Sequence, residues 1–174
     1  MSVRAGVLLM VVTILTLEAT GIIQFIYLQR AIKQEAALRA QSELHSVTNK
    51  IMDVVNQAEG AVINSVWMAE WFLENPDSLK SVPQRVVELN PVVVGSTIAL
   101  VPDYNKKYPL YSPYAVRNME TGEIETLSLA TETYDYPSQE WFTQPMALDK
   151  GYWSEPYFDE GGGEMLMTTF SVPV

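Results

Sequence analysis

The sequence contains no cysteine, which excludes disulfide bonds and any reaction that needs a thiolate. Histidine occurs once, at His45, and one histidine alone does not indicate a metal site. Neither a phosphate-binding glycine loop nor a nucleophile motif of the G-x-S-x-G type is present. Glu155 and Asp159 have the spacing of one strand face, but that spacing does not make an acid–base pair. We therefore expect that the chain is not an enzyme and holds no metal or cofactor.

Basic residues are scarce in this chain. It has 11 lysines and arginines against 21 acidic residues, for a formal net charge of −10. Nucleic-acid binding requires a basic surface that neutralises phosphates, so this balance argues against nucleic acid as a partner. What is abundant is apolar sequence, which makes up 48% of the 174 residues. This length is enough for one ordinary domain and an additional segment.

The longest apolar run comprises residues 5–28 and contains a single ionisable residue, Glu18. A helix of this length measures roughly 36 Å, enough to cross a hydrocarbon layer about 30 Å thick. A cleaved signal peptide is the alternative, but no small-x-small cleavage site follows and apolar residues resume after Glu18. We expect an uncleaved transmembrane helix, preceded by a short cytoplasmic segment at residues 1–4. Glu18 either forms a hydrogen bond between helices or has no specific role.

A second periodic segment follows at residues 29–75. Small or apolar residues recur there at alternating spacings of three and four, and they form a seam: Ala37, Ala40, Leu44, Val47, Ile51, Val54, Ala58, Ala61, Ser65, Met68 and Phe72. Such a seam is typical of a helix that pairs with another helix, and it broadens in its distal half. We expect a long helix that forms a homodimer near the membrane and lies on the domain farther out. It should end near Asn75, because Pro76 disfavours a helical conformation in the residue before it.

The next segment alternates between helical and extended patterns. A short helix is expected from Pro83 to Leu89, where a proline lies near the first turn. Residues rich in β-branched side chains predict strands at Val92–Val101, Tyr111–Asn118 and Ile124–Leu129. A tight turn is expected at Glu120–Glu123, before the third strand.

The last forty residues repeat this alternation. A helix is expected to begin after Ser138, as its N-cap, and to close early at Pro145. Strands are expected at Tyr152–Tyr157 and Met165–Val174, joined by a glycine hairpin at Phe158–Glu164. The acids of the hairpin do not have calcium-loop spacing, so a solvated turn is expected. Taken with the apolar helix, these elements predict an α+β fold.

Four aromatic residues and one acid lie close together in this final segment: Trp141, Phe142, Trp153, Tyr157 and Asp159. Aromatic walls with a few polar groups are what a small-ligand pocket needs, because most of the ligand must be covered while a few contacts orient it. The same residues fill a hydrophobic core equally well, because aromatic side chains dominate core burial. Both interpretations remain open from the residues alone.

The stretches Glu140-Trp141-Phe142, WSEPYFD at 153–159 and TTFSVPV at 168–174 carry a resemblance to a known family. With the long helix, they are similar to the extracytoplasmic Cache sensor domains of bacterial transmembrane receptors, in particular the membrane-distal module of the double-Cache type. The resemblance implies a PAS-like antiparallel sheet at residues 76–174, with a pocket for a small metabolite such as an amino acid, amine, carboxylate or purine. It also implies an anchor in the bacterial inner membrane and a sensor domain in the periplasm or outside the cell.

The same resemblance implies a set of ligand-binding residues, namely Tyr134, Gln139, Trp141, Phe142, Trp153, Tyr157 and Asp159. Amino-acid-binding members have an arginine, which grips a carboxylate bidentately, where this chain has Gln139. They also have a tyrosine where this chain has Phe142. These departures argue against an α-amino acid, whereas Asp159 and the acidic charge fit an amine. The identity of the ligand stays open.

In the family, a fifth strand follows the SVPV segment and lies in the middle of the sheet, whereas this sequence ends at Val174. We therefore expect an N-terminal fragment with an incomplete sheet. A cytoplasmic output domain, such as a chemoreceptor module or an enzyme like a histidine kinase, phosphatase or cyclase, would lie downstream. The alternative is a membrane-tethered structural or pilin-like subunit with no small ligand. In a pilin-like subunit a glutamate follows soon after a cleaved glycine, and the spacing from Gly6 to Glu18 is too long for that.

Overall fold

The computed structural model describes residues 3–104, 106–160 and 162–174. They divide into two units, Met1–Ile51 and Met52–Val174. The first unit consists of the N-terminal part of helix α1, Val3–Ile63, whose last turns belong to the second unit. The most apolar 18-residue window of this helix has a mean hydropathy of 2.1 and is not buried in the protein. By length and composition, α1 can therefore cross a membrane.

Three threonines interrupt the apolar run of α1. The hydroxyl groups of Thr13, Thr16 and Thr20 each donate to a backbone carbonyl three or four residues earlier. A hydroxyl that is satisfied inside its own helix does not need water, so these side chains are compatible with a lipid surrounding.

Helix α1 ends at Ile63, so the expectation of one helix continuing to Asn75 is wrong. The backbone N–H of Ser65 donates to the carbonyl of Val62 at 2.9 Å, and the Ser65 hydroxyl donates to the same carbonyl at 2.8 Å. A serine hydroxyl that competes for a backbone acceptor weakens the regular hydrogen-bond pattern of a helix. The spacing of apolar residues along the helix gives no indication of this local competition, so it could not predict the break.

Two short helices follow this break, α2 at Val66–Phe72 and α3 at Pro76–Leu79. The proline opens α3, and Asn75 before it has a non-helical backbone, as the sequence predicts. Ala61 and Ala69, which flank the break, are both buried. Small residues of the distal helical segment therefore face the domain.

An antiparallel sheet forms the centre of the second unit, with strands in the order β1 (Gly95–Thr97), β2 (Pro113–Arg117) and β3 (Ile124–Ser128). Strand β1 is much shorter than the expected Val92–Val101. The N–H of Ile98 still donates to the carbonyl of Pro113 at 3.4 Å, but proline has no N–H to return the bond. The regular ladder is therefore interrupted there, although the N–H of Leu100 still donates to the carbonyl of Tyr111 at 2.9 Å.

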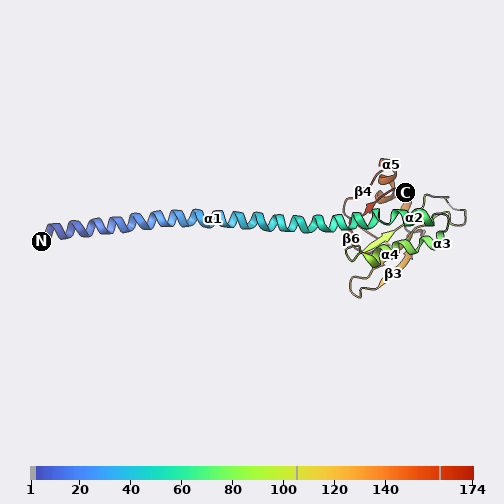
Figure 1. Cartoon of the computed structure of the whole chain (residues 1–174), viewed down its shortest axis with the longest axis horizontal. Helices are drawn as coiled ribbons and strands as arrows, with labels where there is room; N and C mark the ends of the chain where they lie inside the picture. Colours follow the sequence, from blue (N-terminus) through green and yellow to red (C-terminus); the bar gives the residue numbers. More distant parts are fainter. Residues whose placement is uncertain (1–2, 105, 161) are drawn as a thin grey trace. The chain divides into compact units, whose positions relative to one another are not determined.

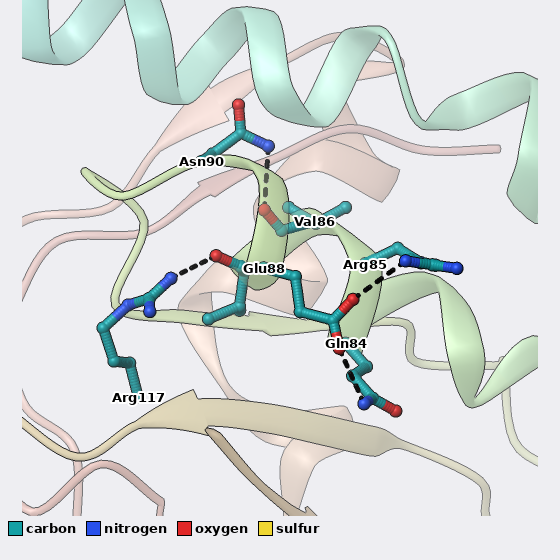
Figure 2. Close-up of polar contacts among 7 residues, drawn as sticks. Gln84, Arg85, Val86, Glu88, Asn90 and Arg117 are labelled. Atoms are coloured by element: carbon teal, nitrogen blue, oxygen red, sulfur yellow. Dashed lines mark hydrogen bonds and ion pairs between the residues drawn. The ribbon is translucent and has the colours of Figure 1, made fainter. Parts of the chain in front are cut away.

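Helix α4, Ser81–Leu89, packs on this sheet (Figure 1) through its buried valines and proline. Figure 2 shows how the end of the helix is held. The side-chain amide of Asn90 donates to the carbonyl of Val86 at 2.8 Å, and the guanidinium of Arg117 donates to the carbonyl of Val87. Both carbonyls lie in the last turn, where a helix lacks its own donors. Arg117 thus joins α4 to the end of β2.

The C-terminal segment forms two further strand pairs rather than one long hairpin. Strand β4 (Tyr152–Trp153) pairs with β7 (Phe170–Ser171), and β5 (Tyr157–Phe158) pairs with β6 (Leu166–Met167), all antiparallel. The expected strands Tyr152–Tyr157 and Met165–Val174 are therefore each interrupted. Between the pairs, Ser154 bonds to the Thr168-Thr169 segment in place of a regular ladder. The hairpin that links β5 to β6 includes residue 161, which lies outside the described residues.

The helix before these strands differs from expectation at both ends. Ser138 is not the N-cap, because Tyr136–Ser138 forms a single 3-10 turn, η1, and α5 runs from Glu140 to Leu148. Pro145 lies inside α5 and does not close it. Proline removes one hydrogen bond from a helix, but the helix continues past Pro145, which is buried. The helix ends instead at Asp149, whose φ is 51°.

The hydrophobic core joins the sheet to the C-terminal segment, and aromatic residues dominate it. Its buried members are Tyr114, Leu129, Tyr134, Tyr136 and Trp141. Tyr136 is fully buried, and its hydroxyl donates to the carbonyl of Leu100 at 2.6 Å. Most buried phenol hydroxyls in folded proteins have a hydrogen-bond partner, and this bond orients the start of α5 on the sheet.

Candidate functional site

A buried carboxylate lies next to this core. Asp159, directly after β5, is 3% exposed. Its Oδ2 accepts the backbone N–H of Gly163 at 2.6 Å, and its Oδ1 accepts the hydroxyl of Tyr134 at 3.3 Å. Asp159 forms no ion pair with the described residues. A carboxylate that is buried without a cation is costly, which marks this position as a candidate for binding a positive group.

Tyr134 and Trp141 extend the Asp159 contact into the core. The indole Nε1–H of Trp141, on α5, donates to the Tyr134 hydroxyl at 3.2 Å, and that hydroxyl donates to Asp159. Burial is the main cause that raises the pKa of Tyr134 to about 12, while the hydrogen bond from Trp141 lowers it and the charge of Asp159 raises it. Tyr134 is therefore a neutral donor at every physiological pH.

A second tyrosine, Tyr114 on strand β2, approaches the Asp159 carboxylate from the central sheet. It is 4% exposed, and its hydroxyl has no hydrogen-bond partner among the described residues. A Cβ atom built on Gly163 would lie 3.3 Å from this hydroxyl and 3.5 Å from Asp159 Oδ2, so both groups face the same glycine. Burial is the main cause that raises the pKa of Tyr114, and the charge of Asp159 and a side-chain hydrogen bond to this carboxylate raise it further. The hydroxyl is therefore within reach of Asp159 but lacks a well-formed hydrogen bond, which fits a site that a ligand completes.

A surface hollow of about 270 Å³ adjoins these groups. It is lined by Val116, Arg117, Asn118, Met119, Glu125, Leu127, Gly162, Gly163 and Met165. Gly163 belongs to this lining and also donates to Asp159, so the glycine segment separates the hollow from the carboxylate. The predicted aromatic residues do not line this hollow.

Five of the seven predicted ligand residues come together. Tyr134, Trp141 and Asp159 are linked by hydrogen bonds, and Phe142 and Tyr157 pack against the same buried cluster. The Phe142 ring meets Trp141 edge to face, with centroids 6.2 Å apart. The Tyr157 hydroxyl bonds to Thr169 Oγ1 at 2.8 Å, and burial raises its pKa.

Two predicted residues lie elsewhere. Gln139 precedes α5, and its side-chain amide donates to the carbonyl of Asp135 at 3.4 Å. Trp153 stacks on Phe170, with centroids 5.3 Å apart, and its Nε1–H donates to Glu59 on α1 at 2.7 Å. Their polar groups are thus engaged outside the Asp159 cluster.

Tyr114 is the residue that sequence reasoning missed. Its strand was predicted, and alternation along that strand would have placed Tyr114 on one face with Val116. The packing of the C-terminal segment decides which face of the strand is buried. It also decides that the Tyr114 phenol lies near Asp159. The available signal was a tyrosine among the apolar residues Pro113, Ala115 and Val116 of that strand.

The model of one protein family, the methyl-accepting chemotaxis protein-like first PDC sensor domain, matches residues 79–174. That match covers more than half of the chain. The chain belongs to this family. Its PDC sensor domain comprises α4, all seven strands and α5, so the Asp159 cluster and the adjoining hollow lie within it. It is a sensor domain of receptors and not itself a catalytic domain.

Solved structures agree with this assignment. The extracellular domain of soHK1S-Z6, described as a histidine kinase, is 27% identical, with a TM-score of 0.56 over 76% of this chain and 57% of that one. Methyl-accepting Chemotaxis protein X is 18% identical, with a TM-score of 0.59 over 75% of this chain and 53% of that one, and this likeness concerns the fold alone. This chain thus spans little more than half of either structure. Among curated proteins, none matches the sequence.

The PDC sensor domain and the apolar helix α1 fit a single-span membrane receptor with the sensor on the extracellular side. Groups of three or more histidine, cysteine or acidic side chains that could hold a metal ion do not occur among the described residues. The candidate site is the Asp159 cluster, with its acid, the three phenols of Tyr114, Tyr134 and Tyr157, and one indole.

Proposed function

We propose that the chain is the ligand-sensing, extracytoplasmic segment of a bacterial receptor anchored in the inner membrane, and that its ligand is a small metabolite with a protonated amine. The buried carboxylate of Asp159 carries this proposal, because no cation among the described residues forms an ion pair with it. An ammonium group has three donors and would compensate the buried charge. The net charge of −10 attracts cations to the domain.

The surroundings of Asp159 suit such a ligand. Trp141, Phe142 and Tyr157 provide aromatic surface beside the carboxylate, and aromatic faces attract cations. The unpartnered hydroxyl of Tyr114 would hydrogen-bond to a polar group of the ligand. The hollow beside Gly162 and Gly163 would be its approach from solvent. Phe142 and Gln139 supply no cationic group for a carboxylate, so a simple amine fits better than an α-amino acid.

In a receptor, the bound state must differ from the free state in a way that reaches the membrane. A ligand shifts such an equilibrium only by its difference in affinity for the two states. Helix α1 connects the domain to the apolar segment without a break before Ile63, so it would carry the change toward a cytoplasmic output domain. Pairing of two α1 helices would make the receptor a homodimer.

Thermal unfolding of the full chain in lipid nanodiscs tests the ligand class. Ethanolamine supplies an amine without a carboxylate, and acetate supplies the reverse. Ethanolamine at 100 times its Kd would add about 2.7 kcal/mol of stability, a rise in Tm of roughly 5–10 °C for a domain of this size. Acetate is expected to leave the Tm unchanged.

The Asp159→Asn variant keeps the shape of the side chain and removes its charge, so it should lose the response to ethanolamine. Glu160→Gln is the matched control, because Glu160 is the exposed acid next in the chain. A response to amines that survives in Asp159→Asn, or no response to amines at millimolar concentration, would contradict the proposal.

A further inference from the structure

We propose that a hydrogen-bonded path from Tyr157 to Glu59 couples the Asp159 cluster to helix α1, with Glu59 and Trp153 as positioning residues. The inference deepens the proposed function, because it rests on Tyr157 being part of the ligand site. Every residue of the path belongs to the unit Met52–Val174. The path runs from Tyr157 through Thr169, Ser154 and Trp153 to Glu59.

The path begins at the aromatic cluster. Tyr157 packs against the buried core, and its hydroxyl lies 2.8 Å from Thr169 Oγ1. Thr169 lies between β6 and β7, so it belongs to the segment that joins the two strand pairs. A change in the position of the Tyr157 ring therefore acts directly on this junction.

Ser154 forms the middle of the path and is 6% exposed. Its hydroxyl accepts the N–H of Thr169 at 3.0 Å, and its own N–H donates to the Thr169 carbonyl at 2.9 Å. The Thr168 hydroxyl donates to the Ser154 carbonyl at 2.7 Å. Three hydrogen bonds thus hold this residue against the junction, in a buried place where unpaired groups are costly. Movement of Thr169 must move the backbone of Ser154.

Trp153, the neighbour of Ser154, connects to the helix. Its ring is tilted on Phe170 of β7, its cross-strand partner, and its Nε1–H donates to Glu59 Oε1 at 2.7 Å. This bond joins residues 94 positions apart, and its acceptor is a carboxylate, which makes it stronger than a neutral hydrogen bond. Glu59 lies about one turn before the end of α1 at Ile63. The indole therefore holds the last turns of the helix to the strand that the Tyr157 contact positions.

Hydrogen exchange of the full chain in nanodiscs, without ligand, tests the coupling. Trp153→Phe keeps the ring on Phe170 and removes only the N–H, so amides of residues 52–63 should exchange about three- to ten-fold faster. Tyr157→Phe removes the hydroxyl at the far end of the path, and the same amides should exchange about two- to five-fold faster. Glu59→Gln keeps an oxygen acceptor but removes its charge, so it should speed exchange less than Trp153→Phe does.

Trp71→Phe is the matched control, because Trp71 lies on α2 with its side chain 79% exposed. It should leave exchange in residues 52–63 unchanged. The coupling is overturned if Tyr157→Phe has no effect on these amides, or if it speeds exchange equally in α4, which would indicate general destabilisation. Because the experiment contains no ligand, its outcome is independent of the response to ethanolamine. If ethanolamine did not raise the Tm, the proposed ligand class would be wrong, but the proposed coupling between Tyr157 and α1 would not be affected.

Discussion

Single residues in this protein are constrained by burial more than by charge pairing. Three phenols, Tyr114, Tyr134 and Tyr157, surround the Asp159 carboxylate. Burial is the first cause of the raised pKa of each of the three, and the negative charge of Asp159 adds to it. The site therefore holds one acid among neutral phenols.

These raised pKa values predict sensitivity to alkali. A tyrosine whose pKa is higher in the folded state contributes stability below its unfolded pKa of about 10, and that stability is lost as the pH rises toward the folded value. For Tyr134 the folded pKa is about 12, so unfolding free energy should fall between about pH 10 and 12. Circular dichroism melts across this range measure the effect.

Tyr134→Phe should flatten this decline, because it removes one ionisation that opposes folding at high pH. The matched control is Tyr104→Phe, in an exposed loop of the described chain, which should leave the profile unchanged. A Tyr134→Phe profile identical to that of the unmodified chain would show that Tyr134 does not contribute to the alkaline transition.

At the level of helices and strands, local competition decides where elements end. Ser65 interrupts the helix that the apolar seam would have continued, and Pro113 interrupts the ladder between the segments of β1 and β2. A glycine is required only where another side chain packs so close to its Cα that a Cβ atom would not fit. A Cβ atom on Gly95 would lie 2.2 Å from the hydroxyl of Tyr114, whereas one on Gly60 of α1 would meet nothing within 4 Å.

Two glycine substitutions should therefore have opposite effects on thermal stability. Gly95→Ala forces the buried Tyr114 ring to move and should cost about 1–3 kcal/mol. Gly60→Ala adds a good helix former in open space and should gain about 1 kcal/mol. Thermal unfolding followed by tryptophan fluorescence would show a lower Tm for the first and a higher Tm for the second. Equal shifts of the same sign would contradict both assignments.

At the level of the whole molecule, the chain combines a PDC sensor domain with helix α1, which is continuous to Ile63 and apolar enough to cross a membrane. The seam on that helix includes Leu44, Val47, Ile51 and Val54, each about half exposed or more. Large apolar side chains at alternating spacings of three and four are typical of helices that pair. The homodimer remains a prediction that this surface supports.

The absence of cysteine makes the dimer straightforward to test by cross-linking in membranes. Val47→Cys places a thiol on the seam, and Asn49→Cys, two residues on, places one on the opposite side of the same helix. Because paired helices bring seam positions close together, Val47→Cys should form disulfide-linked dimers at least about ten-fold faster. Similar rates at both positions would exclude pairing through this seam.

Local sequence determined several features of this protein. The apolar anchor, helix α4, the turn before β3 and the strand at the centre of the sheet each follow from patterns within a few residues, because backbone propensity, turn residues and hydrophobic periodicity act at short range. The resemblance carried by the last forty residues likewise indicated the sensor family that the family match establishes.

Only the tertiary structure decided which of the aromatic residues meet. Trp141 and Trp153 looked equivalent in the sequence, yet one donates to Tyr134 beside Asp159 and the other to Glu59 on α1. These partners lie far apart in the chain or on different elements, so no local pattern encodes them. The direction of an indole N–H depends on which long-range packing buries its ring, and that packing is set by the fold as a whole.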